Sequence, residues 1–240
     1  MSGAIEMKLD YVVGAQRYCG LLLMAPGESS KAAVMLLPDW RGQSPLARDH
    51  ASHLVALGCA VVIVDLYGDG FSPDSPGQVG PMVQQLVAHR TQGVEALGAC
   101  ARQLALHVPP ATPMLCVGFS AGGMIALDYG RSGADVAGII LCSALLKTAE
   151  GTKTRIRAPV LVLQGTQDQV SPMETIAAVI EEMDQAGNDV RFELYSQTHH
   201  AFDNPAAGAD PKARLVYSPI SAKRARGAIA AFLLEITGQS

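Results

Sequence analysis

The residues best suited to do chemistry in this chain form a G-x-S-x-G pentapeptide at residues 118–122. A short apolar run precedes it and a helical pattern follows it. A G-x-S-x-G sequence between a strand and a helix is typical of a nucleophile elbow, a turn so tight that the serine hydroxyl stands out from the sheet. The alternative is an ordinary strand-to-helix turn with a surface serine. We interpret Ser120 as a candidate nucleophile.

A serine hydroxyl attacks a carbonyl carbon efficiently only when a base takes its proton and a carboxylate orients that base. The candidate base is His200, which follows the last expected strand of the chain, residues 190–195. His199 competes with it from the neighbouring position, and the His-x-Phe pattern that ends at Phe202 favours His200. We therefore predict that His200 is the general base.

The candidate carboxylate is Asp168, in a loop directly after the apolar run at residues 160–163. Loops at the carboxyl ends of parallel strands are where α/β sheets place their sites. The alternative is a turn aspartate beside a glycine, and the rival acids Asp184 and Asp189 lie on or beside an expected helix. The chain order serine, acid, histidine is a known triad order, so we predict that Asp168 orients His200.

Acyl transfer also needs N–H donors for the negatively charged oxygen of the tetrahedral intermediate. One should be the backbone N–H of Ala121, directly after the nucleophile, and another should come from the loop after an early strand. That loop spans residues 38–42, and we assign the second donor to the Trp40 N–H. The alternative for Trp40, the only tryptophan, is a core or surface anchor.

Four side chains are candidates for the substrate pocket. Tyr67 lies at a strand end, where it would point into the crevice, although a buried core tyrosine fits the sequence equally well. Arg41 could pair with an anionic substrate, but a solvated loop arginine is favoured. Phe119, beside Ser120, and Asp39, in the loop at residues 38–42, are the other two candidates.

The remaining histidines have structural interpretations. His50 and His53 share one face of an expected helix, a spacing that could suit a metal ion, but a third ligand is lacking nearby in the sequence. We therefore favour a solvated helix face and expect no metal. His89 and His107 are expected at the surface.

The five cysteines are odd in number and form no C-x-x-C pair. Cys59, Cys116 and Cys142 lie within apolar runs and fit small, buried, reduced residues of a cytoplasmic protein. None of the five lies in the polar turn that a nucleophilic cysteine would need. We expect thiols without a catalytic role.

Length, composition and charge limit the class of protein to which this chain can belong. The 240 residues, 49% of them hydrophobic, suffice for one large domain, 1–240, with a substantial core. A formal net charge of −4 and a pI of about 5.8 argue against nucleic acid as a partner. No uncharged apolar stretch is long enough to span a membrane, and residues 1–8 lack the features of a secretory signal. We expect a cytoplasmic monomer or small homo-oligomer.

The elements that must position these residues alternate along the whole chain. Apolar runs without strict alternation predict a mostly parallel sheet of about eight strands, covered by helices on both faces. The first two strands should form an antiparallel pair, residues 68–80 should form a loop, and residues 148–157 a polar connector. Expected strands are 6–12, 18–24, 32–37, 60–64, 114–117, 136–142, 159–163 and 190–195, and expected helices are 45–57, 81–106 as one or two, 123–129, 171–185 and 220–236.

One helix start carries a specific signal. Ser171-Pro172-Met173-Glu174 places a capping serine, a proline at the first helical position and a glutamate three residues after the serine. This pattern predicts a capping box, in which the Ser171 side chain caps the helix.

Taken together, these segments resemble the dienelactone hydrolase family. The resemblance covers residues 7–236 and rests on a combination of motifs rather than on any one of them. The motifs are LPDWRG at 37–42, DLYG at 65–68, GFSAGG at 118–123, Asp168, and HAF at 200–202.

The resemblance implies an α/β-hydrolase fold without a large lid domain. It also implies an enzyme that needs no cofactor and cleaves esters or lactones of small substrates. The enzymes that define the family use a cysteine at the elbow, so Ser120 favours a more general carboxylic-ester hydrolase. A family glutamate pairs with the resting nucleophile, and Asp39 is the nearest carboxylate here, one methylene shorter. The alternatives are hydrolysis of a thioester or peptide, and a silent hydrolase fold that binds a small molecule or partner.

Overall fold

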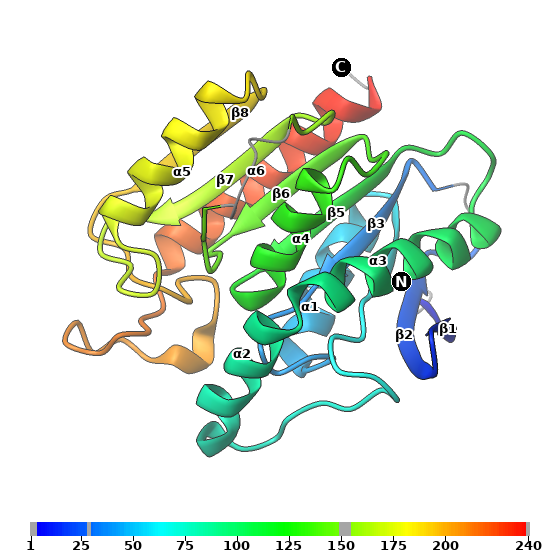
Figure 1. Ribbon diagram of the computed structural model, residues 1–240, viewed down its shortest axis with the longest axis horizontal. Helices are drawn as coiled ribbons and strands as arrows, with labels where there is room; N and C mark the ends of the chain where they lie inside the picture. The colour runs from blue at the N-terminus through cyan, green and yellow to red at the C-terminus, as the bar shows by residue number, and fades with distance from the viewer. Residues whose placement is uncertain (1–3, 28–29, 149–154, 239–240) are drawn as a thin grey trace.

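The computed structural model describes residues 4–27, 30–148 and 155–238, which form one eight-stranded sheet between two layers of helices (Figure 1). In spatial order the strands are β1 (Ile5–Val13), β2 (Gln16–Met24), β4 (Cys59–Ile63), β3 (Ala32–Leu37), β5 (Met114–Phe119), β6 (Gly138–Cys142), β7 (Val160–Gly165) and β8 (Val190–Tyr195). β2 pairs antiparallel with β1 and with β4, and the other pairs are parallel. The predicted sheet is confirmed.

The helices follow the expected pattern with one difference. They are α1 (Pro45–Ala56), α2 (Val79–Ala88), α3 (Arg90–Leu104), α4 (Ala121–Arg131), α5 (Met173–Gln185) and α6 (Pro219–Thr237). Of the alternatives expected for residues 81–106, the structure has two helices, which meet at His89. The difference is that the loop expected at 68–80 ends early, because a 3-10 turn, Pro76–Gln78, precedes α2. Of the expected connector, residues 149–154 lie outside the described residues. No described helix has both the length and the apolar character to cross a membrane.

The start of α5 differs from the sequence prediction. Pro172 occupies the N-cap position, and no side chain caps the helix. The Ser171 hydroxyl instead donates to the carbonyl oxygen of Ala144 at 2.9 Å and accepts the N–H of Leu146 at 2.8 Å. The predicted capping box with Glu174 is therefore wrong, because a loop distant in sequence offers this buried hydroxyl both an acceptor and a donor.

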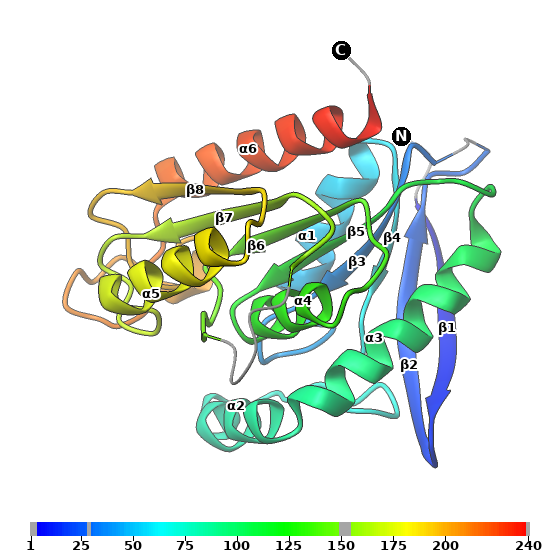
Figure 2. The same ribbon diagram turned by 45° about the horizontal axis from the view of Figure 1, so that its top comes forward.

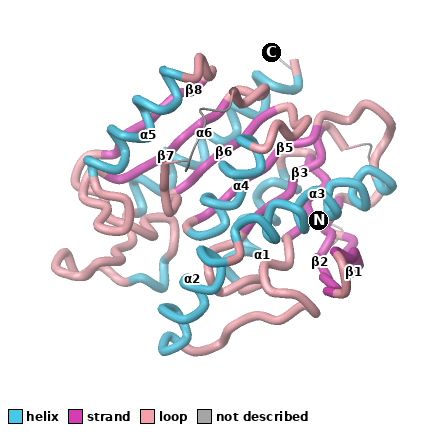
Figure 3. Tube along the Cα trace, in the orientation of Figure 1, coloured by secondary structure: helices cyan, strands magenta, loops and turns pink. Residues whose placement is uncertain are grey.

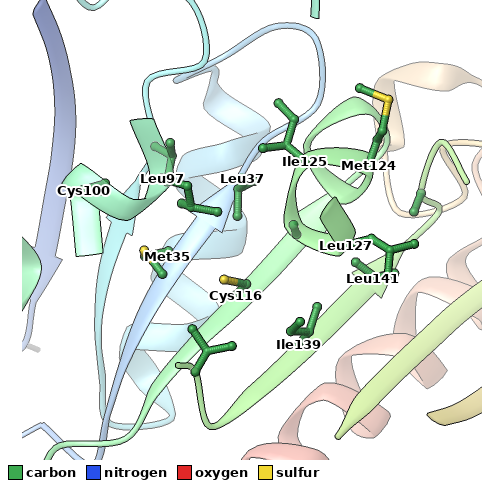
Figure 4. Packing of buried hydrophobic residues seen from close by; sticks show 14 of the residues in the cluster. Met35, Leu37, Leu97, Cys100, Cys116, Met124, Ile125, Leu127, Ile139 and Leu141 are labelled. Carbon is green, nitrogen blue, oxygen red and sulfur yellow. The ribbon is translucent and has the colours of Figure 1, made fainter. Parts of the chain in front are cut away.

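Two apolar layers enclose the sheet. On one face, Leu97 of α3, Ile125 of α4 and Ile176 of α5 belong to a single buried cluster, part of which is seen in Figure 4. On the other face, Leu54 of α1 and Phe232 of α6 belong to a second cluster. Figures 1 and 2 show α3, α4 and α5 on one side of the sheet, with α1 and α6 on the other. Burial on both faces explains why the central strands, β3 to β7, are apolar almost throughout.

The order of the strands places two loops beside each other. After β3 the chain adds β4 on one side, and β5 then returns to pair with β3 on the other. Parallel sheets bind ligands outside the carboxyl ends of their strands at such a reversal. The loop after β3 and the turn after β5, which holds Ser120, meet at this point. Figure 3 shows further loops, in pink, beyond the carboxyl ends of β6 and β7.

Candidate active site

The turn between β5 and α4 holds Ser120 in a conformation that residues with a Cβ rarely adopt. Its φ is 49° and its ψ is −119°, which is typical of strained positions at functional sites. Gly122 lets α4 approach the loop after β3, because a Cβ at this position would lie 2.3 Å from the carbonyl oxygen of Pro38. This strand, tight turn and helix have the form of a nucleophile elbow, and Ser120 is partly exposed at its tip.

The structure brings His200 to this serine from the other end of the sheet. Nε2 of His200 lies 2.9 Å from the Ser120 hydroxyl oxygen, although 80 positions separate the two residues. His200 follows β8 and is only 3% exposed. Of the two adjacent histidines, the sequence-favoured His200 is therefore the one that contacts Ser120.

Asp168 holds the opposite nitrogen of the same ring. Its Oδ2 lies 2.7 Å from Nδ1 of His200 and accepts a hydrogen bond from Nε2 of Gln164 at 2.7 Å. Its Oδ1 accepts the backbone N–H groups of Val170 at 2.7 Å and Ser171 at 2.9 Å. These donors satisfy a carboxylate that is only 2% exposed. Because Asp168 accepts from Nδ1, Nε2 is left to accept the proton of the serine hydroxyl.

A close backbone approach makes this contact possible. A Cβ at Gly165, the last residue of β7, would lie 2.1 Å from the carbonyl oxygen of Thr198. Only glycine allows the loop that carries Asp168 to lie so near the loop that carries His200.

Two buried polar residues of this site were not singled out from the sequence. Gln164 donates to Asp168, as described, and Ser143 accepts the Ala201 N–H at 2.8 Å while its oxygen lies 3.4 Å from Nδ1 of His200. Ser143 has a φ of 47°, a second strained residue at this edge. A polar residue at the end of an apolar run was the available signal for both.

The loop after β3 is fixed around the peptide that joins Trp40 to Arg41. The Tyr67 hydroxyl donates to the Trp40 carbonyl oxygen at 2.6 Å, and the Arg41 N–H donates to Oδ1 of Asp39 at 3.0 Å. Neither bond uses the Trp40 N–H, the donor assigned from the sequence. Ala121 is the first residue of α4, where N–H groups have no partner within the helix. The two expected donors, the N–H groups of Trp40 and Ala121, therefore belong to the loop after β3 and to the start of α4, the two segments that pack together at Gly122.

Asp39, Arg41 and Tyr67 form one polar group at this loop. Nε of Arg41 lies 3.1 Å from Oδ2 of Asp39, and their side chains are 23% and 14% exposed. The favoured interpretation of Arg41 as a solvated arginine is therefore wrong, because its charge is paired and mostly buried. Burial, with a smaller contribution from the Asp39 carboxylate, raises the pKa of Tyr67 above its ordinary value, so this hydroxyl stays protonated and remains a donor.

Two interpretations fail on the α1 side of the sheet. Phe119 is 5% exposed and belongs to the buried core rather than to a substrate pocket, because its position on β5 turns its ring toward α1. There the ring stacks on His50, which is 7% exposed and not on a solvated helix face. His53 is partly buried, whereas His89 and His107 are exposed as predicted. Among the described residues, no three His, Cys, Asp or Glu are grouped to hold a metal ion.

The cysteines are structural. Cys59, Cys116 and Cys142 are buried as predicted, Cys100 is also buried, and Cys19 is partly buried; all five are free thiols. Burial raises the pKa of Cys59 to about 11 and the pKa of Cys100 to about 12. Nucleophilic cysteines have lowered pKa values instead, so the chemistry of this site falls to Ser120.

Comparisons with known proteins agree with this arrangement. The model of the dienelactone hydrolase family matches residues 20–236. No curated protein matches the chain. A solved structure named m3DLH is 29% identical, with a TM-score of 0.89, and the match covers 98% of this chain and 99% of that one. A dienelactone hydrolase-like promiscuous phosphotriesterase from metagenomic libraries is 25% identical, with a TM-score of 0.88 and the same coverage of both chains.

Proposed function

This chain belongs to the dienelactone hydrolase family, and from that premise we propose that it is a serine hydrolase that cleaves carboxylic ester or lactone bonds of small substrates through an acyl-enzyme. The observation that carries the proposal is the continuous hydrogen-bonded series from Ser120 through His200 to Asp168. The sheet topology and the similar solved structures agree with the α/β-hydrolase fold of the family.

In the first half of the reaction, Nε2 of His200 takes the hydroxyl proton of Ser120 while the serine oxygen attacks the carbonyl carbon of the ester. Asp168 holds the ring in the required tautomer and stabilises the imidazolium that forms. The backbone N–H groups of Ala121 and Trp40 donate to the oxyanion of the tetrahedral intermediate. When the intermediate collapses, His200 gives its proton to the alcohol, which leaves, and Ser120 carries the acyl group.

In the second half, His200 takes a proton from water, which attacks the acyl-enzyme. The second tetrahedral intermediate uses the same two N–H donors, and its collapse releases the acid and returns the proton to Ser120. With a lactone substrate, the alcohol and the acid belong to one molecule, so the product is a single hydroxy acid. No step requires a cofactor.

We further propose that the partner of the site is a small molecule and that the protein works in the cytoplasm as a monomer or small homo-oligomer. The five unpaired thiols support a reducing compartment. The name of the 25% identical relative adds phosphotriesters as a substrate class to test. A phosphotriester presents a tetrahedral phosphorus that the Ser120 oxygen would attack. One ester substituent, such as an aryl group, would then leave as its alcohol.

The decisive experiment compares the protein with its Ser120→Ala variant on 4-nitrophenyl esters of increasing acyl length. We expect the unaltered protein to release nitrophenol from short esters, and the variant to lose turnover by roughly 10⁴-fold or more. Diethyl 4-nitrophenyl phosphate serves as a second probe, and mass spectrometry should locate the diethylphosphoryl group on the peptide that contains Ser120.

Two results would contradict the proposal. Near-native ester hydrolysis by Ser120→Ala would exclude this serine as the nucleophile. Failure of the unaltered protein to hydrolyse any nitrophenyl ester or to react with the phosphotriester would favour the silent-fold alternative. Activity on thioesters but not on oxygen esters would assign the same residues to another acyl bond.

A further inference from the structure

A second buried histidine lies next to the candidate site but takes no part in the reaction described above. His50 belongs to α1, the helix that follows the loop with the Trp40 N–H, and it is 7% exposed. Its ring stacks on that of Phe119 with centroids 4.0 Å apart and planes inclined by 3°. Phe119 ends β5 and directly precedes Ser120, so His50 contacts the strand at the point where the nucleophile turn begins.

The same ring also binds the segment that carries the general base. Nε2 of His50 lies 3.0 Å from Oδ2 of Asp203, and the two side chains are 8% and 11% exposed. A carboxylate can only accept hydrogen bonds, so Nε2 carries the proton that His50 donates. Asp203 is three residues after His200, and Ala201 between them has a φ of 58°. The bond between His50 and Asp203 therefore ties the strained turn at residues 200–203 to α1.

The surroundings leave the bond between His50 and Asp203 mostly buried. His50 and Asp203 line a small cavity between α1 and α6 together with Leu54, Val117 and Ile229. A hydrogen bond to a charged group in such a place is costly to leave unmade, because water does not replace the lost partner. The two contacts of His50 thus restrain two segments that lie 80 positions apart at Ser120 and His200.

We propose that His50 is a positioning residue, which holds the end of β5 and the loop at residues 200–203 in the register that aligns Ser120 with His200. Its ring stack fixes one segment and its bond to Asp203 fixes the other. The inference rests on the proposed function for its effect on rate, but the restraint of the two segments can be measured without any substrate.

Three variants separate the contacts. His50→Phe keeps a flat ring against Phe119 and removes the hydrogen bond. His50→Gln keeps an N–H donor and removes the ring, and Asp203→Asn keeps an acceptor oxygen without the charge. His53→Phe is the matched control, since it lies on the same helix and, among the described residues, its buried Nε2 has no hydrogen-bond partner.

In ester hydrolysis we expect His50→Phe to lower kcat by about 10- to 100-fold, the effect of a small misplacement of reacting groups, with KM nearly unchanged. His50→Gln, which keeps the donor to Asp203 but loses the ring stack on Phe119, should recover only part of the lost kcat, and His53→Phe should match the unaltered protein. The double variant His50→Phe with Asp203→Asn should be no slower than the slower single variant, because His50→Phe removes and Asp203→Asn weakens the same bond.

Hydrogen exchange of backbone amides tests the restraint itself. The Ala201 N–H binds the Ser143 hydroxyl and the Asn204 N–H binds the Ala201 carbonyl, so both should exchange faster in His50→Phe than in His53→Phe. Equal exchange in these two variants would overturn the proposal, even in a protein without esterase activity. In an active protein, an unchanged kcat in a folded His50→Phe variant, or a change in KM alone, would also overturn it. If His50→Phe fails to fold, the same comparison is made with Asp203→Asn.

Discussion

Gln164 donates from Nε2 to Oδ2 of Asp168 over 2.7 Å, and that same oxygen lies 2.7 Å from Nδ1 of His200. Gln164 lies within β7 and is fully buried. Its side chain also pairs with the backbone of Ala144, accepting the N–H at 3.1 Å and donating to the carbonyl oxygen at 3.2 Å. One side chain thus ties the acid to its own strand and to the loop that follows β6.

Replacement of Gln164 by leucine should harm both stability and turnover. The change keeps the volume but leaves the buried Ala144 N–H without a partner, which costs about 1–3 kcal/mol. It also removes one of two partners from the Ala144 carbonyl oxygen and from Oδ2 of Asp168. We expect a lower urea midpoint and a lower kcat. Gln167→Leu, at an exposed position three residues further on, should change neither quantity. Equal effects of the two variants would show that the bond to Asp168 is unimportant.

Asp168→Asn tests the acid without changing the size of the side chain. The amide cannot stabilise an imidazolium and favours the wrong tautomer of His200, so kcat should fall by about 10⁴-fold. Asp184→Asn, which alters an exposed rival acid on α5, is the control and should keep full activity. The measurement is 4-nitrophenyl ester hydrolysis at fixed pH. If Asp184→Asn were the slow variant, the assignment of the acid would be wrong.

Gly122→Ala should destabilise the protein strongly, because its Cβ would meet the backbone oxygen of Pro38 at 2.3 Å and backbone cannot move aside cheaply. We expect a loss of about 3 kcal/mol or more in the free energy of unfolding. Gly227→Ala in α6 is the matched control, since nothing lies within 4 Å of its Cβ. That variant should gain about 0.5–1 kcal/mol from the reduced freedom of the unfolded chain. Urea unfolding of both variants measures the contrast.

His53 makes the stability depend on pH. Burial, and then the nearby Arg226 guanidinium, lower the pKa of His53 below its ordinary value of 6.5. The unfolded chain therefore binds more protons at this residue than the folded protein does. Its contribution to stability is complete above 6.5 and decreases as the pH falls toward the lowered folded value. His53→Gln should reduce the loss of stability between pH 7 and pH 5.5, as measured by urea unfolding, and an unchanged loss would contradict the assignment.

The thiols should be hard to modify in the folded protein. Burial raises the pKa of Cys59 to about 11 and the pKa of Cys100 to about 12, and only Cys19 is partly exposed. A disulfide reagent at pH 8 should label Cys19 slowly and the other cysteines only after denaturation. Cys19→Ser should abolish the native signal without loss of esterase activity. Rapid labelling of that variant would mean that a buried strand opens readily.

The amino-acid sequence determined the features that depend on neighbouring residues. Strand-like segments were recognisable from the sequence, since residues 32–37 and 190–195 are β3 and β8 as predicted. The glycines around Ser120 specified the tight turn, because only small residues permit it. The order of Ser120, Asp168 and His200 along the chain then indicated which loops must meet. Each of these signals can be recognised in the sequence alone, because it does not depend on how the layers pack.

Only the tertiary structure decided where side chains of buried strands and helices point. Successive strand residues face opposite sides of a sheet, but a run that is apolar throughout does not reveal which side is which. Phe119 therefore turned out to stack on His50 instead of lining a pocket. Ser171 bonded a distant loop rather than its own helix, and Asp203 reached across to α1. These partners are far apart in sequence, and only the packing of the layers brings them together.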